Sequence, residues 1–205
     1  VWDQDDTPSA WSTPASWTMG LLDPNDWTAH WIGHCDPGAR DPELATGGQL
    51  TLADCHWSWF AEGDPRKSVP AGTRFLRRTF DLPSAVPVQS ARLLLTVDHR
   101  YTVFLNGCTV RKSYAHGNSG MRAYETDVAP FLYPGRNVLA IEAGSAGNRP
   151  AGAIAKLVAT GRDGVPVRVV TDASWKAANQ EVEGWTAPSF DDAAWPAARD
   201  LGEIG

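Results

Sequence analysis

The chain has 205 residues, of which 42% are apolar and 20% charged, a composition typical of a globular protein with one substantial core. Acidic residues (24) outnumber basic ones (18), the formal net charge is -6, and no basic stripe is present, so nucleic acid and anionic membranes are poor candidate partners. No apolar run approaches the length of a membrane span.

Residues 1–22 (VWDQDDTPSAWSTPASWTMGLL) combine an acidic, turn-rich patch with short extended pieces. We interpret them as the last strand of a preceding sandwich domain, so that the chain is an excised piece of a larger protein. The DQDD run can bind calcium, but it lacks a terminal glutamate in register, which favours a solvated turn. Residues 23–205 are expected to form the main domain, and the stretch 34–54, rich in Gly, Pro and Asp, is expected to be a long surface loop.

Short apolar runs recur from residue 56 onward, and almost no segment has helical periodicity. Strands are predicted at 56–60, 75–82, 92–97, 101–105, 123–127, 137–143, 153–160 and 165–171. Asn106-Gly107 and Arg162-Asp163-Gly164 carry the turn residues of hairpins. The pattern predicts an all-β protein, specifically a jelly-roll-type β-sandwich.

The stretch Ala91–Val110 is the centre of this pattern. Leu93 and Leu95 lie on one face of the first run and Leu94 adds apolar surface to the other, which predicts a central strand. The tripeptide at 98–100 joins this run to the next one as the polar corner of a hairpin. A polar corner between rigid strands can be a ligand site; the alternative is a solvated turn that the aspartate caps.

Ten tryptophans against two methionines is a skewed ratio. Sandwich cores bury tryptophan, whereas sugar-binding surfaces expose it, because an indole face stacks on the apolar face of a pyranose. We expect at most one or two of the ten to be ligand platforms and at least one of Trp57 and Trp59 to be buried. Trp175, Trp185 and Trp195 are expected to fasten the C-terminal tail to the sandwich.

The three cysteines, Cys35, Cys55 and Cys108, are too few and too scattered for a disulfide framework, and no spacing suggests zinc. If the protein is secreted, a Cys35–Cys55 bridge can form, because both residues flank the same predicted loop.

Several motifs occur in a fixed order: WSWFAEGDPRKSVPAGTRFLRRTFDLP, LLLTVDHRYTVFLNG, YPGRNVLAIEA, PAGAIAKL, TDASWKA and GWTAPSFDDAAWP. With them, residues 27–205 resemble the accessory β-sandwich of bacterial α-L-rhamnosidases, in particular its rhamnose-binding carbohydrate-binding module. The opening VWDQDDTPSAWS resembles the final strand of the fibronectin III-like domain that precedes this module.

The resemblance implies a non-catalytic module that binds a terminal sugar through calcium. In the family the site is an Asp-Asn pair, a loop asparagine and a backbone carbonyl. The aspartate corresponds to Asp98, and His99 stands in place of the asparagine. Ser145 or Asn148 takes the place of the loop asparagine, and the carbonyl is that of Pro150. The expected calcium ligands are Asp98, Ser145 and Pro150, although a histidine nitrogen suits calcium less well than an amide oxygen.

Aromatic residues complete the expected sugar site. Trp57 is a candidate platform, and Tyr114 and His116 are the rings nearest to the place where the family has a tryptophan. The expected partners are therefore a polysaccharide or oligosaccharide and the other domains of a parent enzyme.

No catalytic residues are predicted in this chain. No carboxylate pair stands out as the acid and nucleophile of a glycosidase, and no GxSxG, P-loop or dinucleotide motif occurs. The parent is expected to be a secreted or periplasmic glycoside hydrolase such as an α-L-rhamnosidase. The alternative function is a purely structural sandwich that braces the catalytic domain.

Overall fold

The computed structural model describes residues 2, 4–8, 13, 50–83, 87–113 and 123–203. The chain divides into two units, Val1–His34 and Cys35–Gly205. In the first unit, Trp2 and Pro8 form an isolated antiparallel bridge. The strand predicted for residues 1–22 otherwise lies outside the described residues, as do Cys35, Tyr114 and His116.

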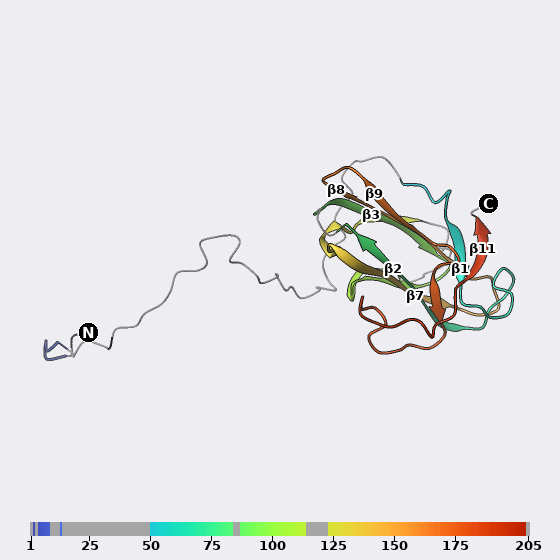
Figure 1. Cartoon of the computed structure of the whole chain (residues 1–205). Helices are drawn as coiled ribbons and strands as arrows, with labels where there is room; N and C mark the ends of the chain where they lie inside the picture. Colours follow the sequence, from blue (N-terminus) through green and yellow to red (C-terminus); the bar gives the residue numbers. More distant parts are fainter. Residues whose placement is uncertain are drawn as a thin grey trace. The chain divides into compact units, whose positions relative to one another are not determined.

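Two antiparallel sheets make up the second unit (Figure 1). One sheet contains β1 (His56–Trp59), β3 (Val88–Val97), β6 (Tyr124–Asp127), β8 (Ala153–Gly161), β9 (Pro166–Val170) and β11 (Arg199–Glu203). The other contains β2 (Gly72–Leu82), β4 (Tyr101–Leu105), β5 (Cys108–Ser113), β7 (Gly135–Ser145) and β10 (Lys176–Ala178). The strand orders are β11-β1-β8-β3-β6, with β9 also paired to β8, and β10-β2-β7-β4-β5. The predicted all-β, jelly-roll-type sandwich is confirmed.

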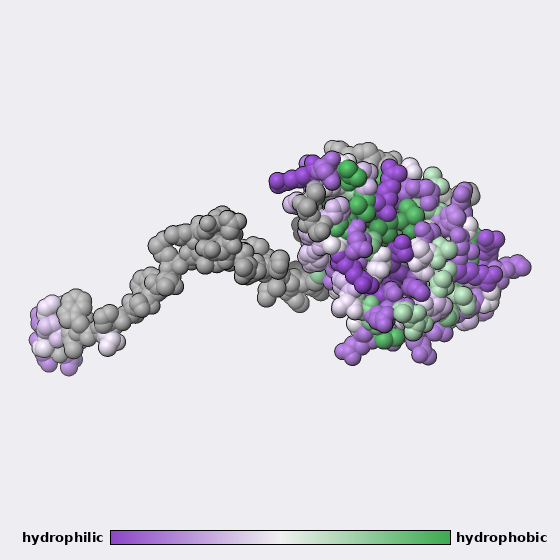
Figure 2. Space-filling model, in the orientation of Figure 1, coloured by the Kyte–Doolittle hydropathy of each residue, from purple (hydrophilic) through white to green (hydrophobic). Residues whose placement is uncertain are grey.

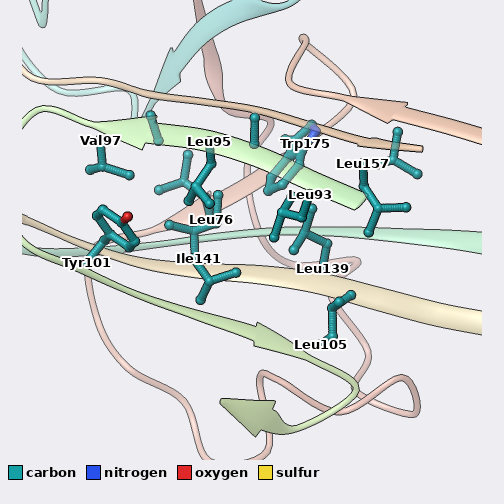
Figure 3. Packing of buried hydrophobic residues seen from close by; sticks show 14 of the residues in the cluster. Leu76, Leu93, Leu95, Val97, Tyr101, Leu105, Leu139, Ile141, Leu157 and Trp175 are labelled. Atoms are coloured by element: carbon teal, nitrogen blue, oxygen red, sulfur yellow. The ribbon is translucent and has the colours of Figure 1, made fainter. Parts of the chain in front are cut away.

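Alternate residues of the central strands fill the space between the sheets. Leu93, Leu95 and Leu157 from one sheet are fully buried against Leu76 and Ile141 from the other (Figure 3). Side chains on the opposite face of β3 and β8, such as Leu94 and Ile154, form a separate small cluster. The face of the sandwich in Figure 2 carries hydrophilic residues with smaller apolar groups between them. Among the described residues, no helix is long and apolar enough to span a membrane; one short 3-10 turn, η3, covers Ala129–Phe131.

The corner at 98–100 is a crossover between the sheets. β3 pairs with β8 and β6, whereas β4 pairs with β7 and β5 in the other sheet. The hairpin predicted for β3 and β4 is therefore wrong. The reason is that β3 is central, as predicted, so both of its edges are already hydrogen-bonded and neither is left for β4.

The Asn106-Gly107 turn does form the predicted hairpin between β4 and β5. Both residues have positive φ, 53° and 85°, which type I′ turns require. The Asn106 side chain also donates to the carbonyl of Phe131 and to Oδ1 of the buried Asn137, at 2.8 Å each, and accepts from the Val138 N–H at 2.9 Å. This one side chain therefore connects a turn to β7 and to η3.

Replacing Asn106 with alanine is expected to lower the free energy of unfolding by about 1–3 kcal/mol, because buried partners lose their hydrogen bonds and alanine disfavours positive φ. Urea denaturation measures the loss. Asn106→Gly is the matched control, since glycine accepts the turn geometry but makes no side-chain bonds. If the glycine variant is as stable as the wild type, the side-chain network contributes nothing.

The C-terminal tail packs on the outer face of the β2–β7 sheet. Trp185 and Trp195 stack at 6.2 Å and join Phe75 in a buried aromatic cluster, while Trp175 is fully buried in the main core. The predicted fastening of the tail by these three tryptophans is confirmed.

A buried ion pair holds the same tail. The Arg77 side chain on β2 is fully buried and pairs with Asp192. Its guanidinium also donates to the carbonyls of Ala187 and Phe190 and lies 5.0 Å from the centre of the Phe190 ring. The tail is thus fixed to the sheet by charge as well as by aromatic packing.

Cys55 is a free, buried thiol, so the Cys35–Cys55 bridge inferred from loop position is wrong. Its side chain packs with Leu52, Leu94 and Ile154, and burial raises the pKa of the thiol to about 11. Cys108, by contrast, is disulfide-bonded.

Candidate functional site

The 98–100 corner lies directly beside the loop that follows β7. The Asp98 N–H donates to the Gly152 carbonyl at 3.0 Å, and the Gly144 N–H donates to the Arg100 carbonyl at 2.8 Å. The corner and the glycine-rich loop are therefore joined by backbone hydrogen bonds at both ends of the loop.

A cavity of about 280 Å³ opens at this end of the sandwich. Its walls come from β1, the turn after β1, the 98–100 corner, the loop before β8, and β11. The lining residues are Trp57, Pro65, Arg66, Asp98, Pro150, Ala151, Gly152 and Leu201. Three residues predicted from sequence, Trp57, Asp98 and Pro150, thus line the same cavity.

Trp57 is a fixed wall of this cavity. The half-buried side chain packs beside the Leu52 and Ile154 cluster, and its ring lies against Gly152. A Cβ at position 152 would lie 2.8 Å from a ring carbon, closer than real Cβ contacts allow, so the ring position depends on a glycine there. Trp59 is fully buried in the main core instead, as expected for at least one of this pair.

The loop before β8 is held by backbone contacts. Asn148 and Gly147 have positive φ, 56° and 83°. The Val69 N–H donates to the Arg149 carbonyl at 3.1 Å, and the Ala151 N–H donates to the Pro65 carbonyl at 3.0 Å. These bonds fix the position of Pro150 between them.

Two other predicted residues form turns away from the cavity lining. Ser145 is buried, and its Oγ accepts the Gly147 N–H at 3.0 Å. Asn148 is exposed and forms the turn itself. His99, although adjacent to Asp98, is not among the lining residues either.

Asp98 is the carboxylate that lines the cavity. Its Oδ2 is buried and has no hydrogen-bond partner among the described residues. Burial raises the pKa of this carboxyl above its ordinary value, while the charges of Arg149 and His99 act in the opposite direction. An oxygen in this state is a strong acceptor that an external hydroxyl or cation can satisfy. Nδ1 of His99 is likewise buried without a partner in the described part of the chain.

Calcium takes six to eight oxygen ligands, so a calcium site here needs several oxygen donors. Of the expected ligands, Asp98 and Pro150 line the cavity. No group of three or more His, Cys, Asp or Glu side chains that could hold a metal occurs among the described residues. The donor set therefore fits calcium only as part of a shell that ligand or water oxygens complete.

Arg66, Pro65 and Leu201 were not predicted as part of the site. Arg66 Nε donates to the Leu201 carbonyl at 3.0 Å, which joins the turn after β1 to β11. These residues are 135 positions apart, so only the pairing of β1 with β11 brings them together. No local sequence signal could have found this wall of the cavity.

The acidic turn after β1 has a structural role. Glu62 accepts two hydrogen bonds from Arg74, both at 2.6 Å, and a third from the Trp59 indole at 3.1 Å. Asp64 lies 3.4 Å from the Lys67 ammonium.

No family model matches the chain. Individual proteins that are similar to it include α-L-rhamnosidases from different bacteria. An α-L-rhamnosidase from Streptomyces avermitilis is 39% identical over 202 residues, covering 97% of this chain and 18% of the relative. An α-L-rhamnosidase from Formosa agariphila is 24% identical over 235 residues, covering 97% of this chain and 23% of the relative. The chain thus spans about a fifth of the length of the curated relatives it matches.

Solved structures give the same result. The S. avermitilis α-L-rhamnosidase complexed with L-rhamnose superposes with a TM-score of 0.71 and 35% identity, covering 100% of this chain and 19% of that one. A lectin from Pleurotus ostreatus in complex with GalNAc has a TM-score of 0.65 and 33% identity, covering 76% of this chain and 44% of the lectin. The resemblance seen in the motifs is confirmed: the chain is homologous to a segment of the α-L-rhamnosidases.

Proposed function

We propose that the sandwich is a non-catalytic carbohydrate-binding module of a glycoside hydrolase and that it binds a terminal or side-chain sugar, L-rhamnose or another pyranose. The observation that carries the proposal is the cavity in which a fixed tryptophan ring and the unpaired, buried oxygen of Asp98 line the same space.

The two features match the two faces of a sugar. A pyranose presents C–H groups that pack on an indole and hydroxyls that donate to a carboxylate. The solved relatives in complex with L-rhamnose and with GalNAc support a sugar as the ligand class.

We further propose that a calcium ion assists the binding of the sugar. Asp98 and Pro150 are the residues that would hold the ion, and vicinal hydroxyls suit its flexible coordination. Ser145 is not among the residues that line the cavity, and its Oγ accepts the Gly147 N–H.

Catalysis is assigned to another part of the parent protein. Glycoside hydrolysis needs two carboxyl groups across the scissile bond, and Asp98 is the one carboxylate among the described lining residues. A parent that degrades polysaccharide outside the cytoplasm agrees with the disulfide at Cys108, a bond typical of oxidising compartments.

Calorimetric titration with L-rhamnose, N-acetylgalactosamine and a panel of polysaccharides, with calcium or with a chelator, tests the proposal. Saturable binding to at least one glycan is expected, and binding to none of them would refute it. Binding that persists in the chelator would show that calcium is not needed, while the proposed sugar-binding function would stand.

Replacing Trp57 with alanine is expected to weaken sugar binding about tenfold or more, because the ligand loses its apolar wall. Trp57→Phe should keep part of the affinity, since a smaller aromatic wall remains. Tyr133→Ala is the control: this ring is 51% exposed and lies outside the cavity lining, so its removal should leave affinity unchanged. Equal affinities for all four proteins would mean that the sugar does not contact Trp57.

A purely structural role, in which the sandwich braces a catalytic domain, is the second candidate. It is favoured by the observation that two of the residues expected as ligands, Ser145 and Asn148, form turns instead. This role predicts that Asp98→Ala leaves the polysaccharide binding of the whole parent enzyme unchanged.

A further inference from the structure

Gly152 lies between the two side chains that carry the proposed sugar site. It directly precedes β8, whose first residue, Ala153, pairs with β1 on one side and with β3 on the other. Trp57 belongs to β1 and Asp98 directly follows β3, so each neighbouring strand brings one of the two groups next to residue 152. Gly152 lines the cavity together with both of them.

The backbone conformation at residue 152 does not require glycine. Gly147, in the same loop, has a φ of 83°, a value that favours glycine, whereas Gly152 is not among the residues with positive φ. An alanine can adopt a backbone of this kind without strain. The reason for glycine at position 152 must therefore lie in the space around its Cα.

The Trp57 ring occupies that space. A Cβ at position 152 would lie 2.8 Å from Cε3 of the indole, 3.5 Å from Cδ2 and 3.6 Å from Cζ3. The ring cannot easily yield, because its side chain packs against the buried cluster that contains Leu52 and Ile154. An alanine at position 152 would therefore displace the indole from its place in the cavity.

The Asp98 corner is attached to the same residue. The Asp98 N–H donates to the Gly152 carbonyl at 3.0 Å, and Val97 pairs with Ala153 in the sheet. Residue 152 thus holds the backbone of the carboxylate through its carbonyl and contacts the indole through its Cα. Its backbone fixes how the two recognition groups lie relative to each other.

We propose that Gly152 is a positioning residue of the sugar site: it lacks a Cβ so that the Trp57 ring and the Asp98 carboxylate can contact one sugar together. This inference rests on the proposed function. Groups that are held in place before the ligand arrives bind it more tightly, because little ordering remains to be done. Displacing the ring should weaken binding even though both recognition side chains are still present.

The test is a double-mutant cycle between positions 152 and 57, measured by calorimetric titration with L-rhamnose, N-acetylgalactosamine and the polysaccharide panel. Gly152→Ala is expected to weaken binding about tenfold. Trp57→Phe removes Cε3 and Cζ3 and leaves a ring carbon near the place of Cδ2, whose 3.5 Å is an ordinary van der Waals distance.

The double variant gives the decisive reading. Since phenylalanine leaves room for a Cβ, Trp57→Phe/Gly152→Ala should bind within about twofold of Trp57→Phe alone. Phenylalanine at position 57 should therefore lower the affinity when residue 152 is glycine and raise it when residue 152 is alanine. A glycine with a purely structural role would not produce this reversal.

Gly144→Ala is the matched control. Gly144 is also buried, is not among the residues with positive φ and does not line the cavity. A Cβ there would meet the side chain of Arg100, 2.5 Å from its Cγ and Nε, but this arginine is exposed and can move into solvent. This variant should keep the wild-type affinity.

The outcomes separate the two proposals. Losses that add in the double variant, or an unchanged affinity in Gly152→Ala, would overturn the positioning role and leave sugar binding intact. An equal loss in Gly144→Ala would also overturn it. If Gly152→Ala does not fold, the double variant should still fold and bind like Trp57→Phe, and its failure to fold would contradict the inference. No binding of any panel sugar by the wild type would instead refute the proposed function.

Discussion

Replacing Arg77 with alanine is expected to lower the free energy of unfolding by about 3–5 kcal/mol. The substitution leaves Asp192 without its cation and the carbonyls of Ala187 and Phe190 without a donor. It also opens space beneath the Phe190 ring. Chemical denaturation measures the loss, and increased proteolysis of residues 179–198 should accompany it, because Arg77 holds this tail on the sheet.

Arg78→Ala is the control on the same strand, because the hydrogen bond of the Arg78 guanidinium to a described residue, the carbonyl of Ser174, is exposed. Its loss should cost under about 1 kcal/mol. Asp192→Asn should destabilise by an amount near that of Arg77→Ala, since it leaves a buried guanidinium without its counter-charge. If Arg77→Ala and Arg78→Ala unfold at the same denaturant concentration, the buried pair does not hold the tail.

Replacing Asp98 with asparagine is expected to weaken sugar binding by about tenfold to a hundredfold, because hydroxyls and calcium lose a charged acceptor. The same change should not destabilise the fold. Oδ2 has no hydrogen-bond partner among the described residues, and burial of the charge opposes folding. Loss of binding without loss of stability is the signature expected of a ligand-binding carboxylate.

The pH dependence follows from the direction of the Asp98 shift. Its folded-state pKa is raised above the ordinary value of 3.8, so the native state holds this proton more tightly than the unfolded state. The contribution of the protonated Asp98 carboxyl to the free energy of unfolding is present below pH 3.8 and is lost as the pH rises through the folded-state pKa. The stability advantage of Asp98→Asn over the wild type should therefore grow over that interval and stay constant above it.

Asp81→Asn is the comparison for affinity and for stability, because Asp81 is exposed on β2. It should change neither the affinity for sugar nor the free energy of unfolding. A large stability loss in Asp98→Asn with unchanged affinity would mean that Asp98 is a structural corner residue.

Local sequence patterns predicted most of the strands. The alternation at Leu93, Leu94 and Leu95 identified a strand that is central in its sheet, and the Asn106-Gly107 dipeptide identified a hairpin that forms. These signals worked because side-chain periodicity and turn chemistry are properties of neighbouring residues.

Features that depend on distant partners could not be predicted in this way. The apolar run before residue 98 indicates which side chains of this strand face the core. It does not indicate which sheet the next strand joins, so the sequence predicts a hairpin where the structure has a crossover. Cys55 is a free thiol that packs against Leu94 and Ile154, which lie far from it in the sequence. In the cavity, Asp98 and Pro150 were found through their motifs, whereas Arg66 and Leu201 meet only through strand pairing.

The pairing of β1 with β11 also has a consequence for biosynthesis. His56 lies opposite Glu203, so the edge of this sheet cannot close until the last strand has left the ribosome. The long-range pairs β1–β11 and β10–β2 give the domain a high contact order, which slows folding. During translation, the nascent chain must therefore carry β1 with one edge exposed until the C-terminal strand arrives and supplies Leu201 to the cavity.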